Sequence, residues 1–342
     1  MTNKPNKFCM NKRIILIIGI LSLLVIAGCD GGLFGGGGDK DAITGIDVRK
    51  GFSGLGMEFL TNAPPENVFE EGRFPISLKI KNAGASDIVD GVLVFGSEIA
   101  YVNASIESEE RQEFSINGKS IFSPVGDEDF ITVSALAKQV GPQSETHPST
   151  IFATACYPYK TILGTSVCID TDIIGEKRGQ KACSIRDLVF GEGQGAPVAI
   201  TKVETRMLPQ DNGKVKPHFI IRIKNAGNGQ VVNLSNFDKA CTSEGLNYKD
   251  FFNRIVVSAS LSGKPLECNG EKIDDTHVIV KLRGGKGSTL EKKEDLIRCS
   301  TKDADDIDTS FDAYVAPLSI ELDYGYTFSI SKDIIIEKIL TY

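Results

Sequence analysis

The sequence predicts an all-β protein, and three observations carry that prediction. Apolar and polar residues alternate in many short stretches, helical periodicity is scarce, and one five-residue sequence occurs twice, each time at the end of an alternating stretch. Alternation with a period of two is typical of a strand with one buried face. The 342 residues are enough for two domains that each bury a core. We therefore expect two tandem β-domains.

The first element is an export signal. An apolar run from Ile14 to Val25 ends on Ile26-Ala27-Gly28-Cys29. The run is shorter than the roughly 20 apolar residues of a spanning helix, so residues 1–28 are predicted to be a lipoprotein signal peptide with Cys29 as the lipidated residue. An uncleaved anchor, an ordinary secretory signal and a pilin-type signal are the alternatives. Lipoprotein signals occur in bacteria and archaea alike, so the host stays open. Four basic residues precede the run: Lys4, Lys7, Lys12 and Arg13.

The second element is a glycine-rich tether at residues 29–41, because glycine populates many backbone states. The whole chain carries a net charge of −7, and removal of the four basic residues before Cys29 leaves −11. An acidic surface argues against nucleic-acid binding and against adhesion through basic patches. We therefore expect contact with the membrane through the lipid alone.

Strands follow the tether. In Phe74–Lys81 the residues Phe74, Ile76, Leu78 and Ile80 fall on one face. A single helical turn is expected at Tyr248–Arg254. The other predicted strands are Gly91–Phe95, Phe130–Ala135, Ile151–Tyr157, Thr165–Ile169, Phe219–Lys224, Arg254–Leu261, His277–Leu282 and Pro317–Leu322.

The chain contains an internal repeat. Ile80-Lys81-Asn82-Ala83-Gly84 recurs as Ile223-Lys224-Asn225-Ala226-Gly227, and both halves end on a strand with two tyrosines. Asparagine and glycine favour turns, so each copy is predicted to end a strand and begin a turn. The glycine-rich segment Gly191–Pro197 suggests the boundary. We expect one domain at residues 42–192 and another at residues 193–342.

These sequences resemble a known domain family. Ile80–Gly84, Ile223–Gly227 and the ending Pro317–Tyr326 look like the immunoglobulin-like β-sandwiches known as cell-adhesion-related domains of bacteria and archaea. The chain beyond the signal also resembles surface proteins of archaea, particularly of small-genome lineages. The resemblance implies seven-stranded sandwiches that act as spacers or adhesive modules, and it carries over no catalytic residue. The long loops Ser105–Asp129 and Asn269–Ile297 depart from the usual pattern.

Cysteines beyond Cys29 predict disulfides, because an even number in an exported chain is typical of a disulfide framework. A zinc site would need closer ligands than the smallest gap here, which is twelve residues. We favour Cys168–Cys183, which would close the polar loop Asp170–Lys181, and Cys268–Cys299. Three cysteines in each half imply either a bridge between the halves or a free thiol in each. The six are Cys156, Cys168, Cys183, Cys241, Cys268 and Cys299.

Two weaker kinds of site remain. Carboxylates at Asp303, Asp305, Asp306 and Asp308 could converge on calcium, although the segment lacks the ligand pattern of an EF-hand and a solvated acidic loop is the competing interpretation. No other cofactor is expected. Asn103-Ala104-Ser105 and Asn233-Leu234-Ser235 fit the glycosylation acceptor pattern of an exported chain.

The expected function is binding or structure at the cell surface. The chain would be anchored by lipid to the extracytoplasmic face of the cell membrane and serve in adhesion, spacing or envelope docking, with a protein or glycan partner and no catalytic activity. One alternative is a subunit of an envelope filament or secretion assembly. Another is a secreted hydrolase in the long loops, which would need His218 or His277 to converge with a serine and a carboxylate.

Overall fold

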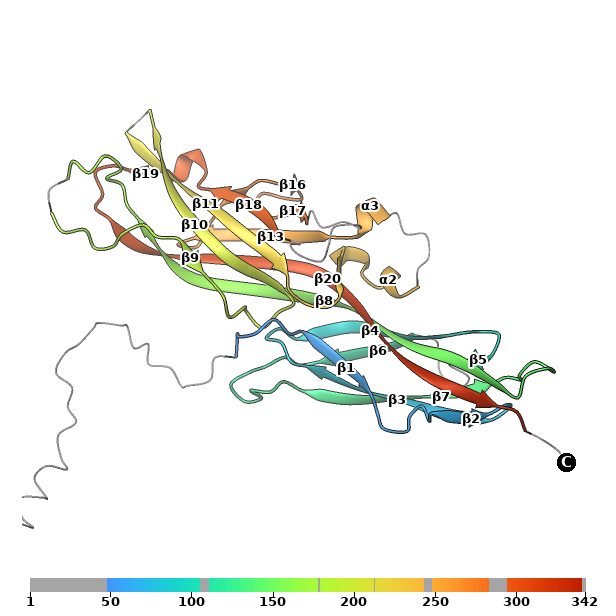
Figure 1. Ribbon diagram of the computed structural model, residues 1–342. Coiled ribbons are helices and arrows are strands. Elements are labelled where there is room, and N and C mark those ends of the chain that lie inside the picture. Colours follow the sequence, from blue (N-terminus) through green and yellow to red (C-terminus); the bar gives the residue numbers. More distant parts are fainter. Residues whose placement is uncertain are drawn as a thin grey trace, which may run out of the picture. The chain divides into compact units, whose positions relative to one another are not determined.

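The computed structural model describes residues 48–104, 111–177, 179–211, 213–242, 248–282 and 294–339 (Figure 1). Strands and turns make up nearly all of them, so the all-β prediction is confirmed. They belong to one compact unit, Ile46–Tyr342. The predicted signal peptide, Cys29 and the predicted tether lie outside the described residues. Within the described ranges, no helix has the length and apolar character needed to cross a bilayer.

The strands form three sheets. In spatial order, the first is β1 (Leu55–Phe59), β3 (Arg73–Asn82), β7 (Glu128–Ala137) and β5 (Val102–Asn103). The second is β15 (Glu267–Cys268), β18 (Glu294–Ser300), β11 (Lys214–Asn225), β10 (Val198–Gln210) and β9 (Leu188–Val189), with β19 (Ile307–Asp308) on β11. The largest is β16 (Glu271–Lys272), β17 (Val278–Lys281), β13 (Arg254–Leu261), β20 (Tyr314–Glu337), β8 (Thr146–Ile169), β4 (Ile88–Ser97) and β6 (Arg111–Ile116).

Short elements complete the fold. Strands β12 (Gln230–Val232) and β2 (Asn67–Phe69) pair with β20, and β14 (Lys264–Pro265) pairs with β13. The helical turns are η1 (Leu234–Asn236), α2 (Lys239–Thr242), α3 (Tyr248–Phe251) and η2 (Asp303–Asp305). The expected helical turn is therefore confirmed as α3.

The alternation that predicted a strand at Phe74–Lys81 corresponds to β3. Its apolar residues point into the core, and each is at most 5% exposed. The strand is stable because these side chains leave water on one face, while Lys79 and Lys81 on the other face stay partly exposed and the buried Ser77 hydroxyl is hydrogen-bonded to Thr132.

Two strands of 24 residues, β8 and β20, run side by side through the largest sheet (Figure 1). They pair antiparallel without a register shift, from Thr146 opposite Glu337 to Ile169 opposite Tyr314. The sequence predicts two separate strands within β8, Ile151–Tyr157 and Thr165–Ile169, but the pairing with β20 is continuous between them, and Pro158 lies opposite Gly325. The sheet thus combines strands from both sides of the predicted boundary after residue 192. The division into two tandem immunoglobulin-like domains stays a prediction.

The internal repeat extends to strand register. Leu55 of β1 lies opposite Asn82 of β3, and Val198 of β10 lies opposite Asn225 of β11. Leu55 and Val198 stand at the same distance in sequence before the repeated asparagines. The pair β1–β3 therefore occupies in one sheet the position that β10–β11 occupies in another.

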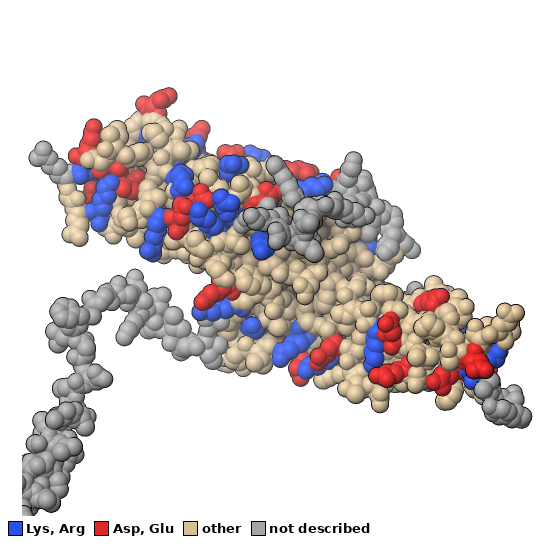
Figure 2. Space-filling view, in the orientation of Figure 1, with Lys and Arg blue, Asp and Glu red and all other residues tan. Residues whose placement is uncertain are grey.

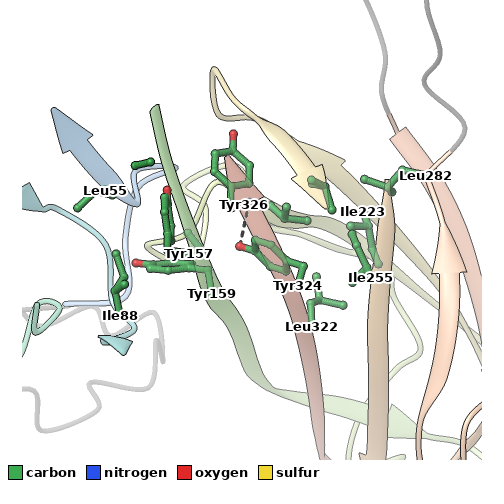
Figure 3. Packing of buried hydrophobic residues seen from close by; sticks show 14 of the residues in the cluster. Leu55, Ile88, Tyr157, Tyr159, Ile223, Ile255, Leu282, Leu322, Tyr324 and Tyr326 are labelled. Carbon is green, nitrogen blue, oxygen red and sulfur yellow. Dashed lines mark hydrogen bonds between the residues drawn. The ribbon is translucent and has the colours of Figure 1, made fainter. Parts of the chain in front are cut away.

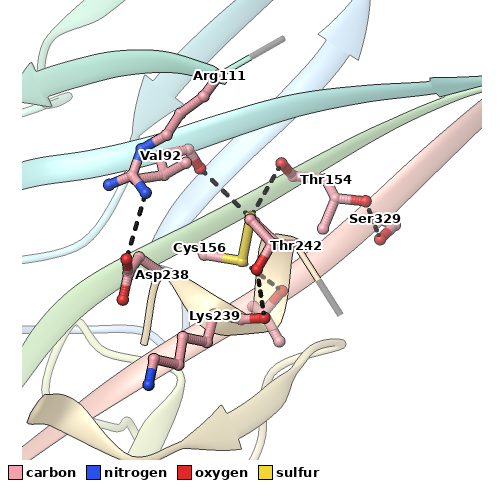
Figure 4. The surroundings of a disulfide bond; sticks show 10 residues. Val92, Arg111, Thr154, Cys156, Asp238, Lys239, Thr242 and Ser329 are labelled. Atoms are coloured by element: carbon pink, nitrogen blue, oxygen red, sulfur yellow. Dashed lines mark hydrogen bonds and ion pairs between the residues drawn. A yellow bond between two sulfur atoms is a disulfide. The ribbon is translucent and has the colours of Figure 1, made fainter. Parts of the chain in front are cut away.

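Three disulfides join the six cysteines. Cys168–Cys183 closes a 15-residue loop and Cys268–Cys299 joins the neighbouring strands β15 and β18, as expected from the sequence. Cys156–Cys241 joins β8 to α2, so a bridge links the two predicted halves (Figure 4). Beside it, Arg111 of β6 and Asp238 form an ion pair of 3.2 Å. Disulfides of this kind indicate an oxidising, extracytoplasmic environment.

Candidate binding groove at the central tyrosine cluster

Four buried tyrosines form a central tyrosine cluster at the middle of the two long strands (Figure 3). Tyr157 and Tyr159 come from β8, and Tyr324 and Tyr326 come from β20. The paired strands β8 and β20 form a central ribbon. The two tyrosines of each strand are separated by one residue, so all four rings lie on one face of this ribbon. Neighbouring ring centroids are 5.8–6.3 Å apart. Burial raises the pKa of all four hydroxyls, that of Tyr326 to about 12.

Two of the hydroxyls bind the first residues of equivalent strands. The Tyr157 hydroxyl is hydrogen-bonded to the backbone of Leu55, at the start of β1. The backbone N–H of Val198, at the start of β10, donates to the Tyr324 hydroxyl at 3.3 Å. The cluster thus fixes β1 and β10 in the same way.

The other two hydroxyls bind the repeated asparagines. In the first copy, Oδ1 of Asn82 accepts from the backbone N–H of Gly84 at 3.1 Å and from the Tyr159 hydroxyl at 3.2 Å. Nδ2 of Asn82 donates to the carbonyls of Ser86 (2.8 Å) and Ile116 (3.3 Å). The N–H of Ser86 lies 3.4 Å from the Tyr159 hydroxyl oxygen. Asparagine and tyrosine together clamp a five-residue turn.

The second copy repeats these bonds, apart from the one to Ile116. Oδ1 of Asn225 accepts from the N–H of Gly227 at 3.2 Å and from the Tyr326 hydroxyl at 3.1 Å. Nδ2 donates to the Gly229 carbonyl at 3.0 Å, and the Gly229 N–H donates to the Tyr326 hydroxyl at 2.9 Å. The repeated sequence therefore encodes a turn that docks on a tyrosine of the central ribbon.

Glycine is required at the third position of each turn. A Cβ on Gly84 would collide with the Tyr159 hydroxyl, and a Cβ on Gly227 would collide with the Tyr326 hydroxyl. The close approach of hydroxyl and backbone explains why both copies read Asn-Ala-Gly.

A groove of about 550 Å³ opens beside the cluster. One wall is β1, which contributes Leu55 and Met57, and another is β20, which contributes Phe328 and Ile330. The remaining wall comes from the second Asn-Ala-Gly turn. The groove residues are Phe52, Ser53, Gly54, Leu55, Gly56, Met57, Ala83, Tyr157, Pro197, Ala226, Gly227, Asn228, Gly229, Tyr326, Phe328, Ser329 and Ile330, and none of them carries a charge.

Charged side chains elsewhere are mixed in sign, as the face in Figure 2 shows. On β10 and β11, the carboxylate of Glu204 lies 3.1 Å from each of Lys202, Arg206 and Arg222. Hydrogen bonds from Lys202 and Arg222 lower the pKa of Glu204. Asp187 pairs with two of the same cations, Lys202 at 2.8 Å and Arg206 at 3.0 Å, so these charges form one mixed network on the sheet.

The aspartates of the predicted calcium site turn to different partners. Across the described ranges, no group of three or more acidic, histidine or cysteine side chains is placed to hold a metal ion. The four aspartates of the predicted site contact separate partners: Asp303 contacts Lys216, Asp305 contacts Lys264 (2.7 Å), Asp306 contacts Thr301 (2.8 Å), and Asp308 contacts the backbone N–H of Ser310 (2.8 Å). The calcium site thus stays a prediction, and this geometry does not support it.

The two glycosylation candidates lie in different surroundings. Asn103 ends β5 and is exposed, while Ser105 of its triplet falls outside the described residues. Asn233 is half-buried and caps η1, where its Oδ1 accepts from the N–H of Ser235 at 3.0 Å. Glycosylation stays a prediction at both positions.

The three histidines lie apart from the groove. His147 stacks on Tyr101 with ring centroids 3.5 Å apart, and His277 Nδ1 lies 2.8 Å from an Asp274 carboxylate oxygen. His218 of β11 is half-buried, which lowers its pKa. Among the side chains that the structure describes, neither His218 nor His277 is hydrogen-bonded to a serine.

Sequence reasoning noted the paired tyrosines but missed their contact with the repeated asparagines and missed the groove. The matched spacing of Asn-Ala-Gly and Tyr-x-Tyr in both halves was the available signal. The groove had no such signal, because its walls come from strands near opposite ends of the folded sequence.

Comparison with known proteins identifies no family. No protein-family model and no curated protein matches the sequence. Among solved structures, the secreted serine protease VesC from Vibrio cholerae is 10% identical with a TM-score of 0.21, over 79% of this chain and 50% of the protease. The sporulation control protein Spo0M from Bacillus subtilis is 10% identical with a TM-score of 0.18, over 50% of this chain and 80% of Spo0M. The chain thus spans about half the length of the protease, and likenesses this distant carry no argument about function.

Proposed function

We propose that the chain is a lipid-anchored cell-surface protein that binds or spaces other molecules and catalyses no reaction. Cys29 would carry the lipid on the extracytoplasmic face of the membrane, and the glycine-rich tether would separate the folded part from the bilayer. The three disulfides support this extracytoplasmic location, because such bonds persist in oxidising compartments.

The chemistry of the groove is the observation that favours binding over catalysis. Its only ionisable side chains are Tyr157 and Tyr326, and both hydroxyls already bond to the fold. Burial raises the pKa of both, so neither is available as an acid or base near neutral pH. A concave surface that combines apolar and uncharged polar side chains suits recognition of another molecule.

The fold supports a mechanical role as well. The repeated turns, the cluster and the Cys156–Cys241 bridge all tie the two halves to one ribbon. We propose two immunoglobulin-like sandwiches of the cell-adhesion-related kind that share this ribbon and act as one stiff arm. The partner would be a protein or glycan at the cell surface.

A subunit of an envelope filament or secretion assembly is the second candidate. One edge of β1 has no strand partner among the described residues, and this favours the second candidate because such edges join chains by strand addition. The two candidates share the proposed location and differ in the partner.

Protease treatment of intact cells tests the proposed location at the cell surface. The folded part should be degraded on intact cells, while a cytoplasmic marker stays intact. Protection of the chain until the cells are lysed would contradict the proposal. Affinity capture from envelope membranes then separates the candidates: companions at fixed stoichiometry indicate an assembly, and recovery of the chain alone indicates adhesion to external ligands.

A further inference from the structure

One sheet edge is covered by the chain itself. β9 pairs antiparallel with β10, and the backbone N–H of Phe190 donates to the Thr201 carbonyl at 2.9 Å. The side-chain amide of Gln194 continues this cover: its Oε1 accepts from the N–H of Ile200 at 2.9 Å, and its Nε2 donates to the Ile200 carbonyl at 3.1 Å. An extended segment therefore occupies the outer edge of β10.

The equivalent edge in the first half is open. β1 corresponds to β10, and Met57 corresponds to Ile200, because each lies two residues after the strand position opposite the repeated asparagine. Within the described ranges, β1 pairs with β3 alone. Its other edge borders the 550 Å³ groove. The groove therefore lies beside β1 at the position that the β9 segment occupies beside β10.

The hydrogen bonds of β1 show which backbone groups face the groove. The N–H of Ala83 donates to the Gly54 carbonyl at 3.0 Å, and the N–H of Leu60 donates to the Ser77 carbonyl at 2.9 Å. Even-numbered positions of β1 therefore bond to β3, and odd-numbered positions point away from it. The N–H and C=O of Met57 point to the open edge, where no described residue is bonded to them.

We propose that the β1 edge is a strand-addition site, at which an extended segment of another protein pairs antiparallel with Met57 and Phe59. Unpaired backbone groups on an edge strand are a template for such pairing. The inference rests on the proposed function as a surface binding protein and adds the chemistry of the partner.

The groove defines the partner segment. Phe328 and Ile330 of β20 and Met57 of β1 are half-buried at its surface, and no charged side chain lines it. Burying an unpaired charge here would be costly, so the inward-facing residues of the partner are apolar. The segment that covers β10 has this character, with Leu188-Val189-Phe190 in sequence.

A synthetic peptide with the sequence of residues 186–194 is the probe. Fluorescence anisotropy would measure its binding to the full chain purified in detergent. Two analogues carry one backbone N-methyl group each. Methylation at Phe190 blocks the N–H that faces the paired strand, and methylation at Val189 blocks the N–H that faces away. We expect saturable binding of the parent peptide and of the Val189 analogue, and at least tenfold weaker binding of the Phe190 analogue.

Amide hydrogen exchange and one pair of variants complete the test. The Met57 amide should exchange rapidly in the chain alone and at least tenfold more slowly with the peptide. Ile330→Lys should weaken peptide binding at least tenfold, while Phe130→Lys, at an exposed position of β7, should leave it unchanged. Three outcomes would each overturn the proposal. They are the absence of saturable binding, an equal loss of binding from both methylations, and a Met57 amide that the chain itself or a second copy already protects without the peptide. Protease treatment of intact cells does not depend on the peptide, so failure of the strand-addition proposal is distinct from failure of the proposed cell-surface location.

Discussion

Replacing Asn82 by alanine should destabilise the protein by about 3–5 kcal/mol. The Asn82 side chain is fully buried and makes four hydrogen bonds, to Gly84, Ser86, Ile116 and the Tyr159 hydroxyl. A hydrogen bond contributes about 1 kcal/mol net, and a buried donor or acceptor that loses its partner costs somewhat more. Alanine removes one hydrogen-bond partner from each of these four groups, and the Tyr159 hydroxyl keeps only its 3.4 Å contacts with Ser86 and Gly195, which gives the expected total.

Urea unfolding of wild type and variant, with disulfides intact and slopes compared, measures this cost. Asn228→Ala is the matched control, because Asn228 lies in the equivalent second turn but is exposed. The control should change the free energy of unfolding by less than about 0.5 kcal/mol. If Asn82→Ala were as mild as Asn228→Ala, the asparagine would not clamp the turn and the reasoning from its bonds would be wrong.

Three further predictions concern the tyrosines, a glycine and a disulfide. Burial raises the tyrosine pKa values above the unfolded value of about 10. The contribution of the tyrosines to stability should therefore be complete below pH 10 and lost as the pH rises through about 12, the pKa of Tyr326. Ultraviolet titration should show the cluster ionising only as circular dichroism reports unfolding. Gly84→Ala should lower the melting temperature by several degrees because its Cβ meets the Tyr159 hydroxyl, whereas Gly164→Ala, with open space around it, should not. Alanine in place of both cysteines of the β8–α2 disulfide, which spans 85 residues, should cost about 4–5 kcal/mol in denaturant unfolding, against about 3 kcal/mol for the 15-residue loop; the reverse order would contradict the chain-entropy argument.

Local patterns in the sequence predicted the fold class well. Alternation located β3, and the short helical pattern at Tyr248–Arg254 located α3. Both elements are encoded by neighbours in sequence, through burial of every second residue in β3 and through a single local turn in α3. The two favoured cysteine pairs were also predictable, because each closes a short segment of the chain.

Features that depend on distant strands were not predictable. The continuous pairing of β8 past Pro158 requires β20, whose partner residue Gly325 lies in the other half of the sequence. The asparagine clamps require tyrosines 77 and 101 residues away. Periodicity reports which side of a strand is buried but not which strand lies beside it, so the shared ribbon and the open β1 edge appear only in three dimensions.

The mass of the amino-terminal peptide from the native membrane protein tests the central claim most directly, because the proposed surface function depends on the anchor. We predict a peptide that begins at Cys29 and carries the mass of a thioether-linked lipid. An unmodified chain that retains the residues before Cys29 would contradict the lipid anchor and the surface function built on it.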